Sequence, residues 1–173
     1  MIWCVTNLLY FCTMDLCIRQ VVIEDNAKLA RIIRQVFDEF DAPHEGTVYS
    51  DPTTDDLFAL FQTPKSVLWV AMMNNVPVGC CGIFPTLGLP DGCAELVKFY
   101  IARKARGKGA GQALMQQCIE WAKHNGYDQI YIESMPQFEK AVGMYEKQGF
   151  ERLTHPMGNS GHFGCTIWML KQL

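Results

Sequence analysis

Hydrophobic and polar positions along the chain follow periods that predict a succession of helices and strands. The run Cys17–Ile23 alternates as a half-buried strand does, and the polar residues after it suit a helix cap. From Ala27 to Phe40, apolar side chains recur at the spacing of one helix face. The segment 41–52 is a loop by its Pro, Gly and Asp content, and a short helix is predicted over 53–62.

The middle and the end of the chain repeat this alternation. Two β-rich runs over 66–73 and 76–84 are joined by Asn74-Asn75, which suits a hairpin turn, and a third strand is predicted over 93–101. The second half predicts a helix from 109 to 125 that stops at Gly126, a strand over 127–134, a helix over 137–148 and a closing strand over 165–173. With no repeat or low-complexity linker, the pattern predicts one α+β domain of mixed topology.

Composition narrows the class of protein. The chain has 173 residues, 49% of them hydrophobic, which is enough for one domain with a substantial core. The formal net charge of −3 includes no basic excess, so nucleic acid is not an expected partner. The eight cysteines contain no C-x-x-C pair, which favours buried, reduced thiols in a cytoplasmic protein over a disulfide framework or a metal site.

The first residues are apolar, but they do not match a targeting segment. Residues 1–13 have no Lys or Arg before the apolar part, show no small-residue cleavage site and are too short to span a bilayer. We therefore expect no membrane attachment. We interpret residues 1–13 as an extension outside the fold, and residues 14–173 as the functional domain.

The stretch "ARGKGAGQALM", Ala105–Met115, contains the main chemical signal. A P-loop needs Lys-Ser/Thr after its last glycine, and a dinucleotide fingerprint needs a glycine three residues after its G-x-G; neither pattern is met here. The spacing is R-x-x-G-x-G, Arg106 to Gly111, directly before an amphipathic helix. Free amides and the positive end of a helix converge on an anion in such an arrangement.

Basic residues gather near this loop. Lys98, Arg103, Lys104, Arg106 and Lys108 are five of the chain's 15 Lys and Arg residues, and we interpret them as suited to a polyanionic cofactor. A plain glycine turn with solvated cations is the alternative.

The segment from Glu95 to Phe150, with its strand, R-x-x-G-x-G loop and helix, second strand and late "MYEKQGF", resembles the GCN5-related N-acetyltransferase (GNAT) superfamily. The resemblance extends in element order from about Arg19 to Leu173. It implies an αβα sandwich whose mixed, mostly antiparallel sheet splays between the fourth and fifth strands. It also implies acetyl-CoA as co-substrate, without a metal, and an amine as acceptor. Homodimers are common in this superfamily.

The resemblance assigns roles to particular residues. The loop would bind the pyrophosphate of acetyl-CoA, and the strand before it would pair with the pantetheine arm. The cofactor-binding residues are then Phe99, Tyr100, Ile101, Ala102, Arg106, Gly107, Lys108, Gly109, Ala110, Gly111 and Gln112. Many members have an asparagine where this chain has Phe138, so the contacts of that asparagine are not carried over.

Two residues are expected to carry the chemistry. Tyr145 stands where the family places the tyrosine that protonates the leaving thiolate, and a phenol stays protonated at neutral pH. Glu95 lies in an apolar strand, where burial raises the pKa of a carboxyl group, and it matches the base of part of the family. Packing of Tyr145 under the sheet, and a water acting as the base in place of Glu95, are the alternatives.

The acceptor side is less defined. Tyr131, Glu133 and His162 are predicted to bind the acceptor, a primary amine of a small molecule, amino acid or peptide that attacks directly in a ternary complex. Acidic residues in the first helices and in "SDPTTDD" suggest a cationic acceptor. An acyl-CoA sensor without turnover, or an enzyme for a bulkier acyl group, remains as an alternative function.

Overall fold

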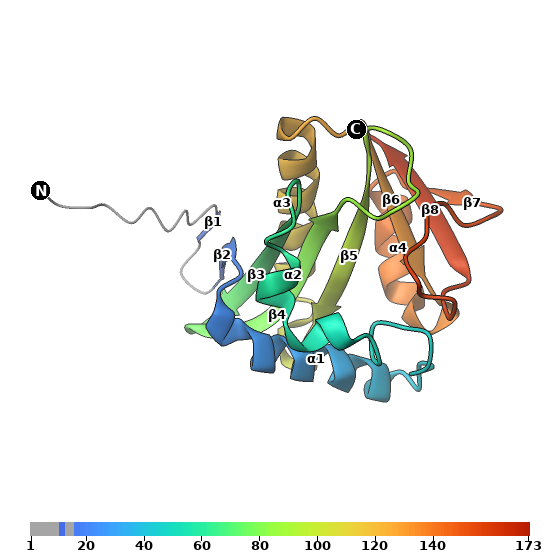
Figure 1. Ribbon diagram of the computed structural model, residues 1–173. Helices are drawn as coiled ribbons and strands as arrows, with labels where there is room; N and C mark the ends of the chain where they lie inside the picture. The colour runs from blue at the N-terminus through green and yellow to red at the C-terminus, as the bar shows by residue number, and fades with distance from the viewer. Residues whose placement is uncertain (1–10, 13–15) are drawn as a thin grey trace, which may run out of the picture.

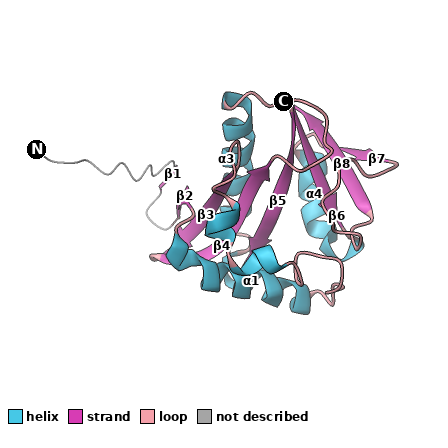
Figure 2. Cartoon of the chain, in the orientation of Figure 1, coloured by secondary structure: helices cyan, strands magenta, loops and turns pink. Residues whose placement is uncertain are grey.

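The computed structural model describes residues 11–12 and 16–173, and these form a sheet with helices on both faces (Figures 1 and 2). In this part of the chain the order of the eight strands is β1-β2-β3-β4-β5-β6-β8-β7. The strands are β1 (Phe11–Cys12), β2 (Cys17–Gln20), β3 (Val67–Met73), β4 (Val76–Phe84), β5 (Cys93–Ile101), β6 (Gln129–Ser134), β7 (Glu151–Leu153) and β8 (Ile167–Gln172). The α-helices are α1 (Asn26–Glu39), α2 (Leu57–Leu60), α3 (Ala110–His124) and α4 (Glu139–Lys147).

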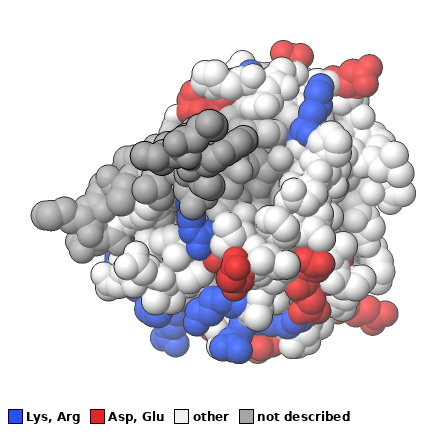
Figure 3. Space-filling view, turned by 60° about the vertical axis from the view of Figure 1, so that its left-hand side comes forward, with Lys and Arg blue, Asp and Glu red and all other residues white. Residues whose placement is uncertain are grey.

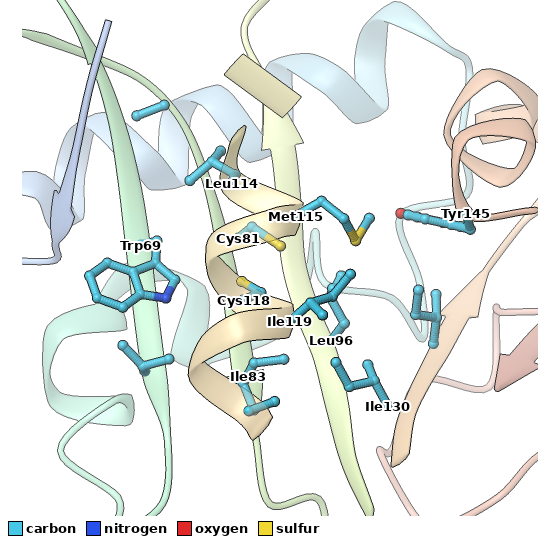
Figure 4. Close-up of a cluster of buried hydrophobic side chains, with 14 of the residues drawn as sticks. Trp69, Cys81, Ile83, Leu96, Leu114, Met115, Cys118, Ile119, Ile130 and Tyr145 are labelled. Carbon is cyan, nitrogen blue, oxygen red and sulfur yellow. The ribbon is translucent and has the colours of Figure 1, made fainter. Parts of the chain in front are cut away.

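Two layers of helices cover the sheet, as an αβα sandwich requires. The apolar face of α1 packs with α2 on one side, in a core that includes Phe37 and Leu57. On the other side α3 and α4 pack over a second core, shown in Figure 4. The neighbours Cys80 and Cys81 divide between these two cores, because successive side chains of a strand point to opposite faces.

The sheet is antiparallel except where β5 meets β6. Those two strands run parallel and pair only over Cys93–Glu95 and Gln129–Tyr131. Beyond Glu95, β5 is paired only with β4, and beyond Tyr131, β6 is paired only with β8. The strands predicted as fourth and fifth from the sequence are β5 and β6, so the expected splay is confirmed.

The hairpin between β3 and β4 matches its sequence signal. Asn74 and Asn75 have φ angles of 49° and 60°, the left-handed pair that a tight hairpin turn needs. Gly126, with φ 81°, ends α3 in the same left-handed region.

Some predicted boundaries differ. The first predicted strand ends at Gln20, because Ile23–Asp25 form a 3-10 turn before α1. The short helix over 53–62 is a 3-10 turn at Pro52–Asp55 followed by α2. The strand β7 was missed because it has three residues, Glu151–Leu153, and depends on pairing with β8. Further 3-10 turns lie at Arg103–Ala105 and Pro136–Phe138.

Most of the predicted extension, residues 1–13, lies outside the described residues. Its residues Phe11 and Cys12 form β1, which pairs with β2 at the edge of the sheet. In the described residues no helix is long and apolar enough to cross a membrane.

Candidate active site

A pocket of about 970 Å³ follows the free edge of β5. Every residue from Glu95 to Ile101 lines it, together with parts of α1, α4 and the loops around Asp51 and His162. The pocket exists because β5 and β6 separate after Glu95. At about 3.3 Å per residue, Glu95 and Ile101 stand roughly 20 Å apart along the strand, so the pocket is long.

The glycine loop forms one end of this pocket. Gly107 and Gly109 have φ angles of 74° and 83°, and a Cβ atom added to either would meet nothing within 4 Å. Among the described residues, no carbonyl accepts a hydrogen bond from the amides of 107–112. These amides lie at the N-terminus of the 15-residue α3, whose dipole adds positive potential. The loop is therefore a cradle for an anion.

The side chain of Arg106 is occupied within the protein. Its Nε donates to the carbonyl of Ile101 at 2.9 Å, and its Nη2 lies 2.7 Å from Glu39 Oε2. The guanidinium also lies over the ring of Phe40, 5.0 Å from the centroid. Arg106 thus ties the loop to β5 and α1, and the amides are left to meet a ligand.

The other predicted cofactor residues divide between the pocket and its surroundings. Phe99, Tyr100, Ile101, Arg106, Gly107 and Gly111 line the pocket, whereas Ala102, Lys108, Gly109, Ala110 and Gln112 do not. The amide of Ala102, just after β5, donates to the carbonyl of Val78 at 2.8 Å, so it is already used within the protein. Phe138 joins an aromatic wall of the pocket, 5.4 Å from Phe37 and 6.2 Å from Tyr100 between ring centroids.

Lys98 does not belong to the cation group at the loop, so that part of the prediction was wrong. Lys98 has φ 53° at a bulge in the β4–β5 pairing, and its side chain is buried. Its Nζ donates to Asp51 Oδ2 at 2.9 Å and to Thr54 Oγ1 at 3.1 Å. Burial lowers the pKa of Lys98, and the charge of Asp51 opposes that shift.

Surface charges near the loop are mixed. In Figure 3, Lys and Arg side chains gather along the lower edge, at the height of α1 in Figure 1, with Asp and Glu side chains among them. Two acidic residues of this part of the fold have basic partners: Glu39 on α1 pairs with Arg106, and Asp55 before α2 pairs with Arg34. Acidic residues predicted from the first helices to attract a cationic ligand are thus partly neutralised within the protein.

Glu95 lies at the far end of the pocket and is 4% exposed. The pKa of Glu95 is raised to about 7, mainly by burial and also by the charge of Glu133. A hydrogen bond from the Thr86 hydroxyl and the nearby His162 and Lys98 oppose this rise. Apart from Thr86, no described side chain hydrogen-bonds to this carboxyl group. A carboxyl group of this pKa can accept a proton near neutral pH.

Tyr145, on α4, is buried at the wall of the pocket. Its ring centroid lies 6.1 Å from that of Phe99 on β5 and 6.0 Å from that of Phe150. Figure 4 shows the hydroxyl turned toward α3, and no described residue hydrogen-bonds to it. Burial raises the pKa of Tyr145 well above its usual value, so the phenol keeps its proton.

The three predicted acceptor residues take different positions. Glu133 and His162 line the pocket, whereas Tyr131 lies behind it. The Tyr131 hydroxyl donates to Glu133 Oε1 at 2.9 Å and accepts from the amide of Met157, so Tyr131 supports Glu133. The Ser160 hydroxyl donates to Glu133 Oε2 at 2.6 Å.

Asp51 lines the pocket, and the sequence indicated it only as one acid of the segment "SDPTTDD". Burial would raise the pKa of Asp51, but His162, at 3.3 Å, and Lys98 hold it well below its usual range. Thr53 adds two hydrogen bonds, from its amide and its hydroxyl. The available signal was a lysine inside the apolar strand 93–101, because a buried ammonium group needs a carboxylate partner.

The comparisons with known proteins agree with this geometry. Residues 33–150 match the family described as "Acetyltransferase (GNAT) family". The uncharacterized N-acetyltransferase YjgM of Escherichia coli (strain K12) is 33% identical over 156 residues, 90% of this chain and 93% of that protein.

Solved structures share the fold. A GNAT-family acetyltransferase of Staphylococcus aureus Mu50 superposes with a TM-score of 0.79 at 18% identity, over 91% of this chain and 98% of that one. The Salmonella typhimurium protein YncA, solved with its cofactor acetyl-CoA, gives a TM-score of 0.71 at 18% identity, over 91% and 94%. With the family match over most of its length, and a pocket along a splayed strand, the chain belongs to the GNAT family of acetyltransferases.

Proposed function

We propose that the protein transfers an acetyl group from acetyl-CoA to a primary amine, by direct attack in a ternary complex. The observation that carries this proposal is one continuous pocket along the unpaired edge of β5, from the free amides of the glycine loop to the buried Glu95. The similarity to a Salmonella protein solved with acetyl-CoA supports the choice of donor.

The residues present fit this donor. The open space around Gly107 and Gly109 lets a diphosphate approach the amides of the loop. The edge of β5 from Leu96 to Ile101 has no strand beside it on the pocket side among the described residues, so it can pair with an amide-containing arm. Acetyl-CoA supplies a thioester, the activated form of the acetyl group.

Two side chains then handle protons. Glu95 takes a proton from the attacking amine, directly or through a water, because its pKa of about 7 matches that task. Tyr145 donates a hydrogen bond or a proton to the departing sulfur, since its hydroxyl is protonated and has no protein partner among the described residues. The thiol of Cys118 packs in the core beside Cys81 and does not line the pocket (Figure 4). Cys165 lines the pocket, but burial raises its pKa to about 12, which disfavours the thiolate that an acyl-enzyme would need. Both observations support direct transfer.

A titration and a screen test the proposal. Calorimetry with acetyl-CoA should show binding, and a thiol-release assay over a panel of amines should show turnover for at least one class. Binding without thiol release from any amine would favour an acyl-CoA sensor. Faster release from a longer acyl-CoA would favour a bulkier acyl donor.

The proposal also covers the location of the enzyme, the bounds of its domain and its oligomeric state. The cysteines whose side chains the structure describes are free thiols, which supports a reducing, cytoplasmic location. We take 14–173 as the acetyltransferase domain. Sedimentation at several concentrations would decide whether it forms a homodimer.

A further inference from the structure

The acceptor end of the pocket, which we define by Asp51, Glu95, Lys98, Glu133 and His162, has an unequal distribution of charge. Some of these five side chains are already paired within the protein and others are not, and this difference indicates which acceptor the pocket can bind. It rests on the proposed function, because it concerns the amine that the enzyme acetylates.

The two basic side chains at this end, Lys98 and His162, face the same carboxylate. Lys98 Nζ lies 2.9 Å from Asp51 Oδ2, and His162 Nε2 lies 3.3 Å from the same oxygen. Lys98 is also held by the hydroxyl of Thr54, at 3.1 Å. Both basic side chains therefore already have an acidic partner within the protein.

The two remaining carboxyl groups accept hydrogen bonds only from neutral side chains among the described residues. Glu133 accepts hydrogen bonds from the hydroxyls of Tyr131 and Ser160. Glu95 accepts one from Thr86 at Oε2, and its Oε1 has no partner among the described residues although the side chain is buried. This unpartnered oxygen, in a residue that lines the pocket, marks the position for a donor from the ligand.

The other two Lys and Arg side chains that line the pocket lie outside the acceptor end as defined above. Arg106 follows β5 and is paired with Glu39. Lys140 lies on α4, which follows the C-terminal end of β6, and β6 runs parallel to β5. Residues 1–10 and 13–15, outside the described ranges, contain no Lys, Arg or His.

We infer that the acceptor is a cationic amine with no carboxylate next to its amino group, and that Glu133 enforces this preference. The ammonium form is attracted by Glu95 and Glu133, and Glu95 then removes its proton. A carboxylate on the adjacent carbon would be placed against Glu133 with no free cation to offset the repulsion. Free α-amino acids are therefore poor acceptors.

Matched pairs of acceptors test this inference in the thiol-release assay with the full chain. Suitable pairs are tyramine and tyrosine, agmatine and arginine, and isoamylamine and leucine. The decarboxylated amine is the stronger base, so a preference for it cannot arise from a larger fraction of free amine. We expect its kcat/KM to exceed that of the amino acid by about tenfold or more.

Variants connect the preference to one side chain. Glu133→Gln should reduce the ratio of kcat/KM between the amine and its amino acid by about threefold or more. Glu133→Asp retains the charge and should leave this ratio unchanged. Glu151→Gln removes the same charge from an exposed position outside the pocket and should leave the ratio unchanged. An unaltered ratio in Glu133→Gln would overturn the role of Glu133.

The outcomes separate the inference from the function on which it rests. Amino acids that react as well as their decarboxylated partners would overturn the inference and leave the acetyltransferase intact. A panel with no thiol release from any amine, despite acetyl-CoA binding, would overturn both.

Discussion

At Glu95, burial among apolar residues contributes more to the raised pKa than any neighbouring charge. The same is true of Tyr145, whose pKa is raised mainly by burial. The same effect of burial suits the two residues to different roles. It gives the carboxyl group a pKa at which it exchanges protons near neutral pH, and it keeps the phenol protonated.

The pH dependence of kcat/KM should report Glu95. We expect activity to rise with pH and to level off above about 7, because the base must lose its proton first. Glu95→Gln should lose most of the activity and this rising limb. Thr86→Val should move the midpoint upward, since the hydroxyl of Thr86 lowers the pKa of Glu95. A midpoint that stays in place in Thr86→Val would contradict this account.

Tyr145→Phe should lower kcat by about 100-fold or more while acetyl-CoA binds with nearly unchanged Kd. The reason is that the hydroxyl has no structural partner among the described residues, so only the step at the sulfur loses its donor. Tyr127→Phe is a matched control, because that hydroxyl donates to the carbonyl of Lys65 outside the pocket. It should cost about 1 kcal/mol of stability and leave kcat alone. Unchanged turnover in Tyr145→Phe would remove it as the acid.

At the scale of secondary-structure elements, the two glycines that flank α3 can be compared with each other. Gly109 precedes α3 and Gly126 follows it, both have positive φ, and both face open space. Gly109→Val and Gly126→Val should each lose at least about 1–2 kcal/mol of stability through left-handed strain. Only Gly109→Val should abolish acetyl-CoA binding in calorimetry, since its side chain blocks approach to the amides. Equal binding by both variants would show that the loop is only a turn.

Local signals predicted most elements because those elements depend on near neighbours. The Asn74-Asn75 turn and the apolar stripe of α3 are examples, and both were found as expected. The position of Lys98 could not be predicted in this way. A bulge at Lys98 sets its direction, and its partner Asp51 is 47 residues away in the chain, so the contact depends on the tertiary fold.

The site, like the fold, could be predicted from the sequence only in part. Pattern and family resemblance singled out Glu95, Tyr145 and the glycine loop, and Glu95, Tyr145 and three residues of the loop line one pocket. They did not reveal that Tyr131 supports Glu133 from behind, or that Asp51 joins His162 to Lys98. The contacts of Asp51 join segments distant in sequence, and no periodicity predicts them. Tyr131 and Glu133 lie on the same face of one strand, but a two-residue spacing does not predict that their side chains form a hydrogen bond.

For the whole molecule, the buried carboxyl group of Glu95 should reduce stability above neutral pH. The folded state raises its pKa from 4.5 to about 7, so it holds the proton more tightly than the unfolded chain does. Stability from this group is complete below pH 4.5 and is lost as pH rises toward 7.

Glu95→Gln should therefore unfold at higher denaturant concentration than the wild type at pH 8, and with little difference at pH 4.5. The gain is on the order of 1–3 kcal/mol, from the size of the pKa shift. Urea unfolding at a series of pH values measures it, with the exposed Glu151→Gln as control. A difference independent of pH would show that ionisation of Glu95 is not the cause.

The early divergence of β5 and β6 has a consequence for solubility. A strand with unsatisfied backbone groups on one side is ordinarily a template on which other chains aggregate. Here the open side of Leu96–Ile101 faces a cleft walled by α1, α4 and the loop of His162, instead of the outer surface. A slender, flexible molecule can enter and complete the ladder, while the bulk of a second protein is kept out.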